Sequence, residues 1–247
     1  MTRARWGAAV AVVIVALGAG LLFFVRLDRD PEPLAARPAG KRPTLLLLTS
    51  LPIVFGEDFS LQWGGSPVLT ALSKRYRVMP ISVTGPSALA KSDLLLMAQP
   101  RAQPAENLVA LDQWVRRGGR VLLLADPMLE WPSSRALGDP LRPPLMFADT
   151  GLLGHWGLRL DAPDERGPRT ATLSGFGVLM VSPGTLYAAG SGTCDVADDR
   201  TVAECRLGHG QASVVADADL LNVQQLGSAA DHNIDGLLAE LARLERA

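Results

Sequence analysis

Hydrophobic positions divide the chain into one long apolar run and a following region where short apolar runs alternate with amphipathic stretches. Residues 7–25 form nineteen consecutive positions without a charge, between Arg5 and Arg26. As a helix they would span roughly 28 Å, close to the thickness of a bilayer's hydrocarbon core. We therefore predict a membrane anchor over residues 1–26, with residues 7–25 in contact with lipid. A cleaved signal peptide is the alternative, but its apolar core is typically shorter and ends at a small-residue cleavage site.

Charges around this run bear on the orientation of the anchor. Arg3 and Arg5 precede it without any acid, whereas Arg26 and Arg29 follow it among acidic residues. A short basic segment before the first apolar run favours a cytoplasmic N-terminus. The prediction is a single-pass protein of the inner (plasma) membrane, with its globular part in the periplasm or another extracytoplasmic space. Residues 27–43, rich in proline and charge, are expected to be an extended linker.

The region 44–247 begins with a regular alternation of patterns. Apolar runs without polar interruption are typical of strands buried on both faces, and intervening stretches have helical periodicity. The strands are predicted over 44–49, 76–83, 92–98 and 120–125, and the helices over 66–75 and 104–117. This order predicts an α/β domain with a parallel, doubly wound sheet.

The second half of this region has a different character. Residues 127–144 hold many prolines and predict an irregular insertion, and short β-like pieces separated by Gly, Pro and Asp favour antiparallel hairpins. These strands are expected over 170–173, 177–181, 185–188 and 202–207, with a buried strand over 212–216 and helices over 150–156 and 234–246. A single domain over residues 44–247 is long enough to bury its own core.

Composition and motifs narrow the function classes. The chain has 24 basic and 25 acidic residues without a basic stripe, so nucleic acid is not an expected partner. It lacks a P-loop, a G-x-G-x-x-G fingerprint, an H-E-x-x-H helix and a G-x-S-x-G elbow. We expect no cofactor, no metal and no enzymatic activity.

Polar residues that follow the predicted strands are the candidate ligand-binding residues, because ligands of open α/β sheets collect at the carboxyl ends of strands. These candidates are Ser50, Glu57, Asp126, Asp217 and Asp219. Acids at such positions often cap the next turn through backbone N–H groups. A carboxylate cluster can alternatively bind a ligand or a hard cation such as Mg²⁺. A metal-assisted hydrolase of the cell envelope is therefore the alternative function.

The two cysteines of the chain, Cys194 and Cys205, are separated by ten residues. Outside the cytoplasm such a pair is expected to form a disulfide. Closing this loop stabilises a protein by about 3 kcal/mol in the chain-entropy description. The alternatives are a zinc site, for which His209 is the one histidine nearby, and two unrelated buried thiols.

Four segments of the sequence resemble a known family. The segment LDQWVRRGGRVLLLADP is similar to the helix, Gly-Gly, strand and Asp-Pro pattern of auxiliary proteins of uncharacterised ABC-type transport systems. The related gliding-motility auxiliary subunits and a neighbouring domain of unknown function share this pattern. GHGQASVVADADLLN, DHNIDGLLAEL and LLLLTSLPIVFGED resemble further segments of the same proteins, and the likeness extends over residues 44–245.

The resemblance implies a fold like that of class I glutamine amidotransferases, a flavodoxin-like sheet, generally without the catalytic cysteine. Ser50, Gln99 and Asp126 stand after the strands here, and none is a cysteine. The implied role is a non-catalytic, membrane-anchored extracytoplasmic accessory of a transporter, with an ABC permease or ATPase subunit as partner. The chain ends in the charged segment ELARLERA, whereas members of the family often have a second membrane span there.

Overall fold

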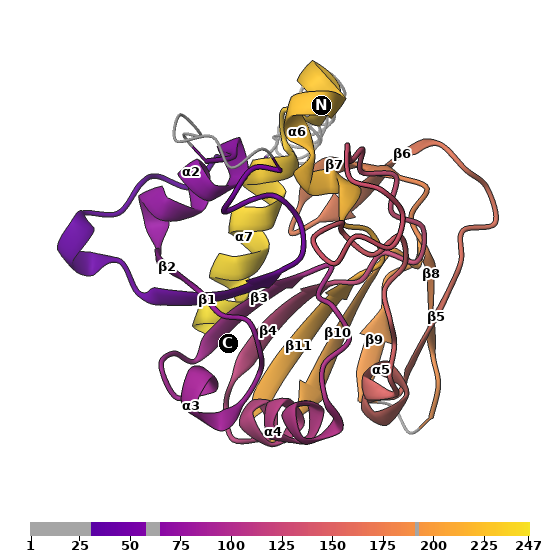
Figure 1. The fold of residues 1–247 in the computed structure, drawn as a ribbon. Coiled ribbons are helices and arrows are strands. Elements are labelled where there is room, and N and C mark those ends of the chain that lie inside the picture. Colours follow the sequence, from indigo (N-terminus) through magenta and orange to yellow (C-terminus); the bar gives the residue numbers. More distant parts are fainter. Residues whose placement is uncertain (1–30, 58–64, 191–192) are drawn as a thin grey trace, which may run out of the picture. The chain divides into compact units, whose positions relative to one another are not determined.

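The structure, a computed structural model, describes residues 31–57, 65–190 and 193–247 (Figure 1). Residues Pro33–Ala247 form one compact unit. The predicted anchor over residues 7–25 lies outside the described residues. Within the described ranges, no helix is both long enough and apolar enough to cross a membrane.

A seven-stranded sheet forms the centre of this unit, in the order β2-β1-β3-β4-β11-β10-β9. Its strands are β1 (Thr44–Thr49), β2 (Arg77–Pro80), β3 (Leu94–Ala98), β4 (Arg120–Leu124), β9 (Cys194–Val196), β10 (Val202–Leu207) and β11 (Gly210–Val215). The first five strands in the sheet are parallel, and β10 pairs antiparallel with both β11 and β9. With β11 as the fifth strand, the parallel part has the 2-1-3-4-5 order of flavodoxin-like sheets. The predicted α/β class and parallel sheet are confirmed.

Helices cover both faces of the sheet, as the uninterrupted apolar strands require. The helices are α2 (Pro67–Arg75), α3 (Pro86–Leu89), α4 (Ala105–Arg116), α5 (Leu152–Trp156), α6 (Val223–Leu226) and α7 (Asn233–Arg246), with short 3-10 turns at Ala39–Lys41, Asp219–Leu221 and Gly227–Ala230. In β1, Leu45 and Leu47 belong to the core that contains Leu241 of α7. Leu46 and Leu48 belong to the core on the opposite face, which contains Leu111 of α4. Because side chains of a strand alternate between faces, one apolar run serves both cores.

An insertion between β4 and β11 carries the smaller sheets. β5 (Leu158–Asp161) pairs antiparallel with β8 (Thr185–Ala188), and β6 (Pro168–Leu173) pairs with β7 (Phe176–Val181). Residues 125–151 contain neither helix nor strand, as predicted for the proline-rich segment. The antiparallel hairpins are confirmed, whereas β5, β9, α3 and α6 were not predicted.

The observed boundaries differ from the predicted ones at several places for local reasons. β2 ends at Pro80 rather than at residue 83; the N–H of Ile81 still donates to the Leu47 carbonyl at 2.9 Å, and the pairing with β1 stops there. Ser66 caps α2 as predicted, and its hydroxyl accepts the N–H of Leu69. The helix predicted over 150–156 begins at Leu152, after Asp149 has accepted the N–H of Gly151.

The compact unit begins about ten residues before the predicted domain start at Thr44. The Arg37 guanidinium pairs with the Glu245 carboxylate at 2.8 Å, and its backbone N–H donates to the Lys74 carbonyl. Arg37 therefore lies between the C-terminal ends of α2 and α7. Both helix ends are at the amino edge of the parallel strands, so the chain enters the domain at that edge. Part of the predicted linker is fixed to the domain.

The predicted disulfide is present and ties β9 to β10. Cys194 and Cys205 are direct partners in the antiparallel register, and their sulfurs are bonded. The pair lies in the core below α5, where Trp156 is also buried. The zinc and free-thiol alternatives are therefore wrong.

Candidate functional site

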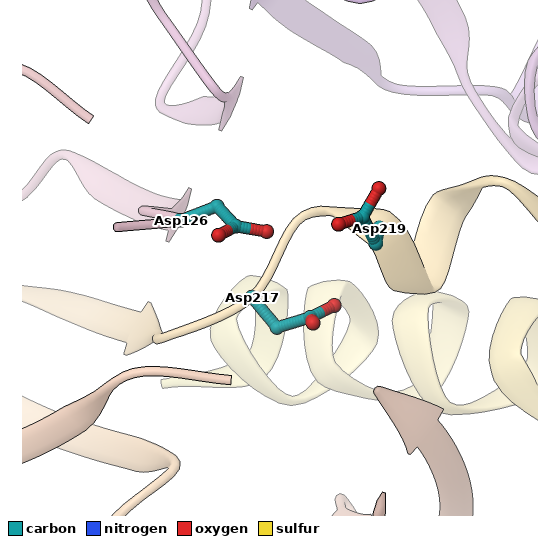
Figure 2. Close-up of side chains that lie close together, drawn as sticks. All are labelled: Asp126, Asp217 and Asp219. Atoms are coloured by element: carbon teal, nitrogen blue, oxygen red, sulfur yellow. The ribbon is translucent and has the colours of Figure 1, made fainter. Parts of the chain in front are cut away.

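The five candidate residues separate into two sites at the carboxyl edge of the sheet. Asp126, Asp217 and Asp219 come together, with carboxylate oxygens within 4.8 Å of one another (Figure 2). Ser50 and Glu57 line a separate pocket. The acids meet because β4 and β11 are neighbours in the sheet, whereas β1 is separated from β11 by β3 and β4.

Asp126 is fully buried and connects the end of β4 to the end of β11. One carboxylate oxygen accepts the N–H of Met128 at 2.8 Å, and the other accepts the N–H of Ala218 at 2.9 Å. The side chain of Gln99 donates to the Asp126 carbonyl oxygen and accepts its N–H, each at 3.0 Å. The carboxylate therefore acts as a cap for two backbone segments.

The other two acids have the same type of contact. Asp217 accepts the N–H of Leu220 at 2.7 Å and that of Val181 at 2.8 Å, which fixes β7 to the end of β11. Asp219 accepts the N–H of Glu130 at 2.7 Å, which fixes the insertion to the same place. Backbone N–H groups thus engage all three carboxylates, in agreement with the capping interpretation.

Burial sets the protonation of this acid cluster. It raises the pKa of Asp126 to about 6 and that of Asp219 to about 7, against hydrogen bonds that favour the charged forms. The pKa of Asp217 is raised well above its ordinary value by burial and by the neighbouring charge of Asp126. Among the described residues these acids are the set close enough to share a cation. A cation there would have to compete with the backbone N–H groups for carboxylate oxygens.

The second site is a pocket of about 340 Å³ at the carboxyl ends of β1 and β2. It lies at the point where the chain crosses from one side of β1 to the other, and ligands of open α/β sheets bind at such a point. Its lining is mostly aliphatic and proline side chains, with a few hydroxyls and charges. Besides Ser50 and Glu57, the residues that matter below are Leu47, Thr49, Leu51, Phe55, Ile81, Arg101, Arg135 and Leu141.

Glu57 is held by the insertion. One carboxylate oxygen accepts both the N–H and the hydroxyl of Ser134 at 2.8 Å. Burial opposes its ionisation, but the nearby Ser133, the hydrogen bonds from Ser134 and the charge of Arg135 outweigh burial and lower its pKa. Arg135 in turn donates to the Glu57 carbonyl oxygen at 2.7 Å and lies 3.5 Å from Asp139. Glu57 therefore joins the β1–α2 loop to the insertion and is ionised at neutral pH.

Arg101 differs from Arg135 in having no carboxylate partner among the described residues, and its guanidinium donates to the Arg142 carbonyl oxygen at 2.6 Å. Sequence reasoning selected acids at strand ends and missed both arginines. Arg101 follows β3 by three residues, so the rule that selects polar residues after predicted strands, here called the strand-end rule, could have included it. Arg135 belongs to the insertion, and its place in the pocket depends on the path of that loop.

Large apolar side chains are exposed beside this pocket. Phe55 and Leu141 line it and are 71% and 55% exposed. Leu137, Leu145 and Met146 of the same insertion are also exposed. Exposed apolar groups gathered near a pocket are typical of interaction sites.

Comparison with known families identifies the class of protein. Residues 42–164, about half of the chain, match the model of a family described as an ABC-type uncharacterized transport system. The chain belongs to this family, as its sequence patterns predicted. No curated protein sequence matches it.

Several solved structures are similar in part. They include a cytoplasmic protein from Salmonella typhimurium (12% identity, 81% of this chain and 98% of that chain, TM-score 0.48). An exo-β-1,4-mannosidase from an Opitutaceae bacterium matches at 13% identity over 83% of this chain and 36% of that chain, with a TM-score of 0.47. A ThuA-like protein from Bacteroides uniformis matches at 9% identity over 84% and 93%, with a TM-score of 0.45. The chain spans about a third of the length of the mannosidase.

Proposed function

We propose that this protein is a membrane-anchored, extracytoplasmic accessory domain of an ABC-type transport system, and that it acts by binding rather than by catalysis. The observation that carries the proposal is the position of the family match. Residues 42–164 contain the complete lining of the pocket, including the exposed Phe55 and Leu141. The segment that defines the family therefore builds the binding edge.

The placement of the pocket supports a binding role. It lies at the carboxyl edge of the sheet, and the chain enters the domain at the amino edge through Arg37. Arg37 and the pocket thus lie at opposite edges of the sheet. Exposed Phe55 and Leu141 beside arginines give this edge the composition found in protein interfaces.

The extracytoplasmic placement rests on two features of the chain. The uncharged run over residues 7–25 has the length of a membrane span. The Cys194–Cys205 disulfide is of a kind that persists in oxidising compartments. Protease treatment of intact spheroplasts tests the topology: we expect the domain to be digested from outside, and protection until the membrane is lysed would contradict this placement.

Site-specific photocrosslinking in native membranes tests the transporter role. A photoreactive residue at Leu141 reports on the pocket edge, and one at Val109 of α4 is the matched control, since both positions are exposed and apolar. We expect peptides of an ABC permease or ATPase to crosslink from Leu141 and not from Val109. Crosslinks to the same bulk envelope proteins from both positions would refute the transporter role.

A metal-assisted hydrolase is the second candidate, favoured by the approach of Asp126, Asp217 and Asp219 within 4.8 Å. A metal that binds the native state raises the melting temperature by mass action. Thermal melts with Mg²⁺, Ca²⁺, Mn²⁺ and Zn²⁺ separate the two functions. We expect no shift; a shift that Asp219→Asn abolishes would establish a metal site and favour the hydrolase.

A further inference from the structure

The pocket at the ends of β1 and β2 has the size and lining of a small-molecule site. Its volume of about 340 Å³ is at the lower end of the range for such sites. Phe55, Ile81 and Leu141 contribute accessible apolar surface, and four prolines add more. This lining favours a ligand with a compact apolar body.

The hydroxyls at the strand ends already donate hydrogen bonds to backbone carbonyl oxygens. Thr49 donates to the Ala98 carbonyl oxygen at 2.9 Å, and Ser50 donates to the Gln99 carbonyl oxygen. A hydroxyl that has donated its proton presents only lone pairs to a ligand. The interior around these strand ends therefore does not stabilise an anion.

Positive charge is supplied instead by two arginines that line the pocket. Arg101 is exposed, and among the described residues the one acceptor of its five N–H donors is the Arg142 carbonyl oxygen. Arg135 also lines the pocket, but Asp139 and the Glu57 carbonyl oxygen already engage it. Glu57 lines the pocket with one carboxylate oxygen on Ser134 and the other without a hydrogen-bond partner among the described residues. Arg101 is therefore the charge that a ligand can neutralise.

We propose that this pocket binds a small amphiphilic anion, with its apolar body against Phe55, Ile81 and Leu141 and its anionic head at Arg101. The inference extends the proposed function, because it names the ligand class of the binding edge. The source of the ligand is either a free organic acid or the headgroup region of an anionic lipid.

Equilibrium dialysis with radiolabelled hexanoate tests the proposal. The full-length chain is embedded in phosphatidylcholine nanodiscs, and empty nanodiscs supply the blank. Hexanamide has the same length without the charge, and hexylammonium has the opposite charge. We expect saturable hexanoate binding at least tenfold tighter than binding of either analogue. Equal binding of hexanoate and hexanamide, or no saturable binding, would overturn the proposal.

Variants assign the head and the body of the ligand. Arg101→Gln is expected to weaken hexanoate binding about tenfold, and Leu141→Ser to weaken hexanoate and hexanamide together. The matched control is Arg206→Gln, an exposed arginine on β10 that does not line the pocket. Hexanoate affinity unchanged in Arg101→Gln would refute the assignment of the head.

Two further comparisons distinguish the two sources of the ligand and test the transporter role and the ligand class separately. Competition by phosphatidylglycerol added to the nanodiscs would support a lipid headgroup, and its absence would support a free acid. Hexanoate binding without any crosslink to a transporter would refute the transporter role alone. A crosslink to a permease without hexanoate binding would refute the pocket's ligand class alone.

Discussion

Raising the pH from 5 to 8 is expected to destabilise the domain, because Asp126, Asp217 and Asp219 must then carry charge inside it. Each has a folded-state pKa above the unfolded value of about 3.9, chiefly through burial. At pH values between the unfolded-state pKa and the folded-state pKa, the folded state therefore binds more protons than the unfolded state. The stabilisation is complete below the unfolded pKa and is lost as the pH rises through the folded one.

The magnitude follows from the two pKa values of about 6 and about 7. Starting from pH 5, Asp126 lowers the free energy of unfolding over about one pH unit, up to its pKa of about 6, and Asp219 over about two, up to its pKa of about 7. Each of these pH units corresponds to about 1.4 kcal/mol. The sum is about 4 kcal/mol. Protonating one acid relieves the repulsion on its neighbours, so we expect about 2–4 kcal/mol for the cluster.

The acids whose pKa is lowered do not obscure this range. The pKa values of Glu57, Asp112 and Glu240 are lowered although burial opposes their ionisation, because hydrogen bonds and nearby arginines favour the charged forms. Their stabilisation is present above the ordinary carboxyl pKa and is lost as the pH falls below it. Stability is therefore expected to be greatest near pH 5.

Urea unfolding followed by tryptophan fluorescence measures the effect at intervals between pH 5 and pH 8. Asp219→Asn removes one titrating group but keeps an oxygen that can accept the Glu130 N–H, so its stability curve should be clearly flatter. Asp149→Asn is the control, since Asp149 also caps backbone N–H groups but is exposed. Stability that is flat or rises from pH 5 to pH 8 in the unaltered protein would refute the reasoning.

Three further predictions concern stability and use urea midpoints. Replacing both Cys194 and Cys205 by Ala should cost about 3 kcal/mol, and a midpoint insensitive to this change would contradict a role for the disulfide in stability. Ser66→Ala removes the N-cap of α2 and should cost about 1 kcal/mol, an effect that Ser66→Asp should largely avoid. Gly210→Ala places a Cβ 2.0 and 2.2 Å from two backbone carbonyl oxygens and should cost about 3 kcal/mol or more. Gly154→Ala in α5, where nothing lies within 4 Å, should be neutral or stabilising; equal losses in the two variants would refute this steric argument.

The local sequence pattern predicts best those strands and helices that have a continuous apolar run or a clear apolar stripe. The run over Thr44–Thr49 is apolar on both faces and coincides with β1, and the stripe of α4 ends where Gly118 adopts a positive φ. β5 and β9 have four and three residues, too few for a clear pattern, and β5 pairs with β8 across the intervening β6–β7 hairpin. The order of strands in the sheet also depends on such contacts, so the sequence predicted the class of sheet more readily than its details.

The candidate residues show the same limit. The strand-end rule selected polar residues correctly as members of the carboxyl edge, but it does not state which strand ends are neighbours. Asp126 and Asp217 met because β4 pairs with β11, whereas Ser50 belongs to another part of the edge. Arg101 and Arg135 belong to loops, and the path of the insertion sets their positions.

The acid cluster and the pocket are connected through Gln99. This residue has a left-handed backbone, with φ of 44°, which costs a non-glycine residue on the order of 1 kcal/mol. Its buried side chain hydrogen-bonds both the N–H and the carbonyl oxygen of Asp126 and also donates to the Pro144 carbonyl at 3.2 Å. Pro143, the preceding residue, lines the pocket. The capping acids therefore do not need to touch a ligand to matter for binding, because they fix the insertion that forms one wall of the pocket.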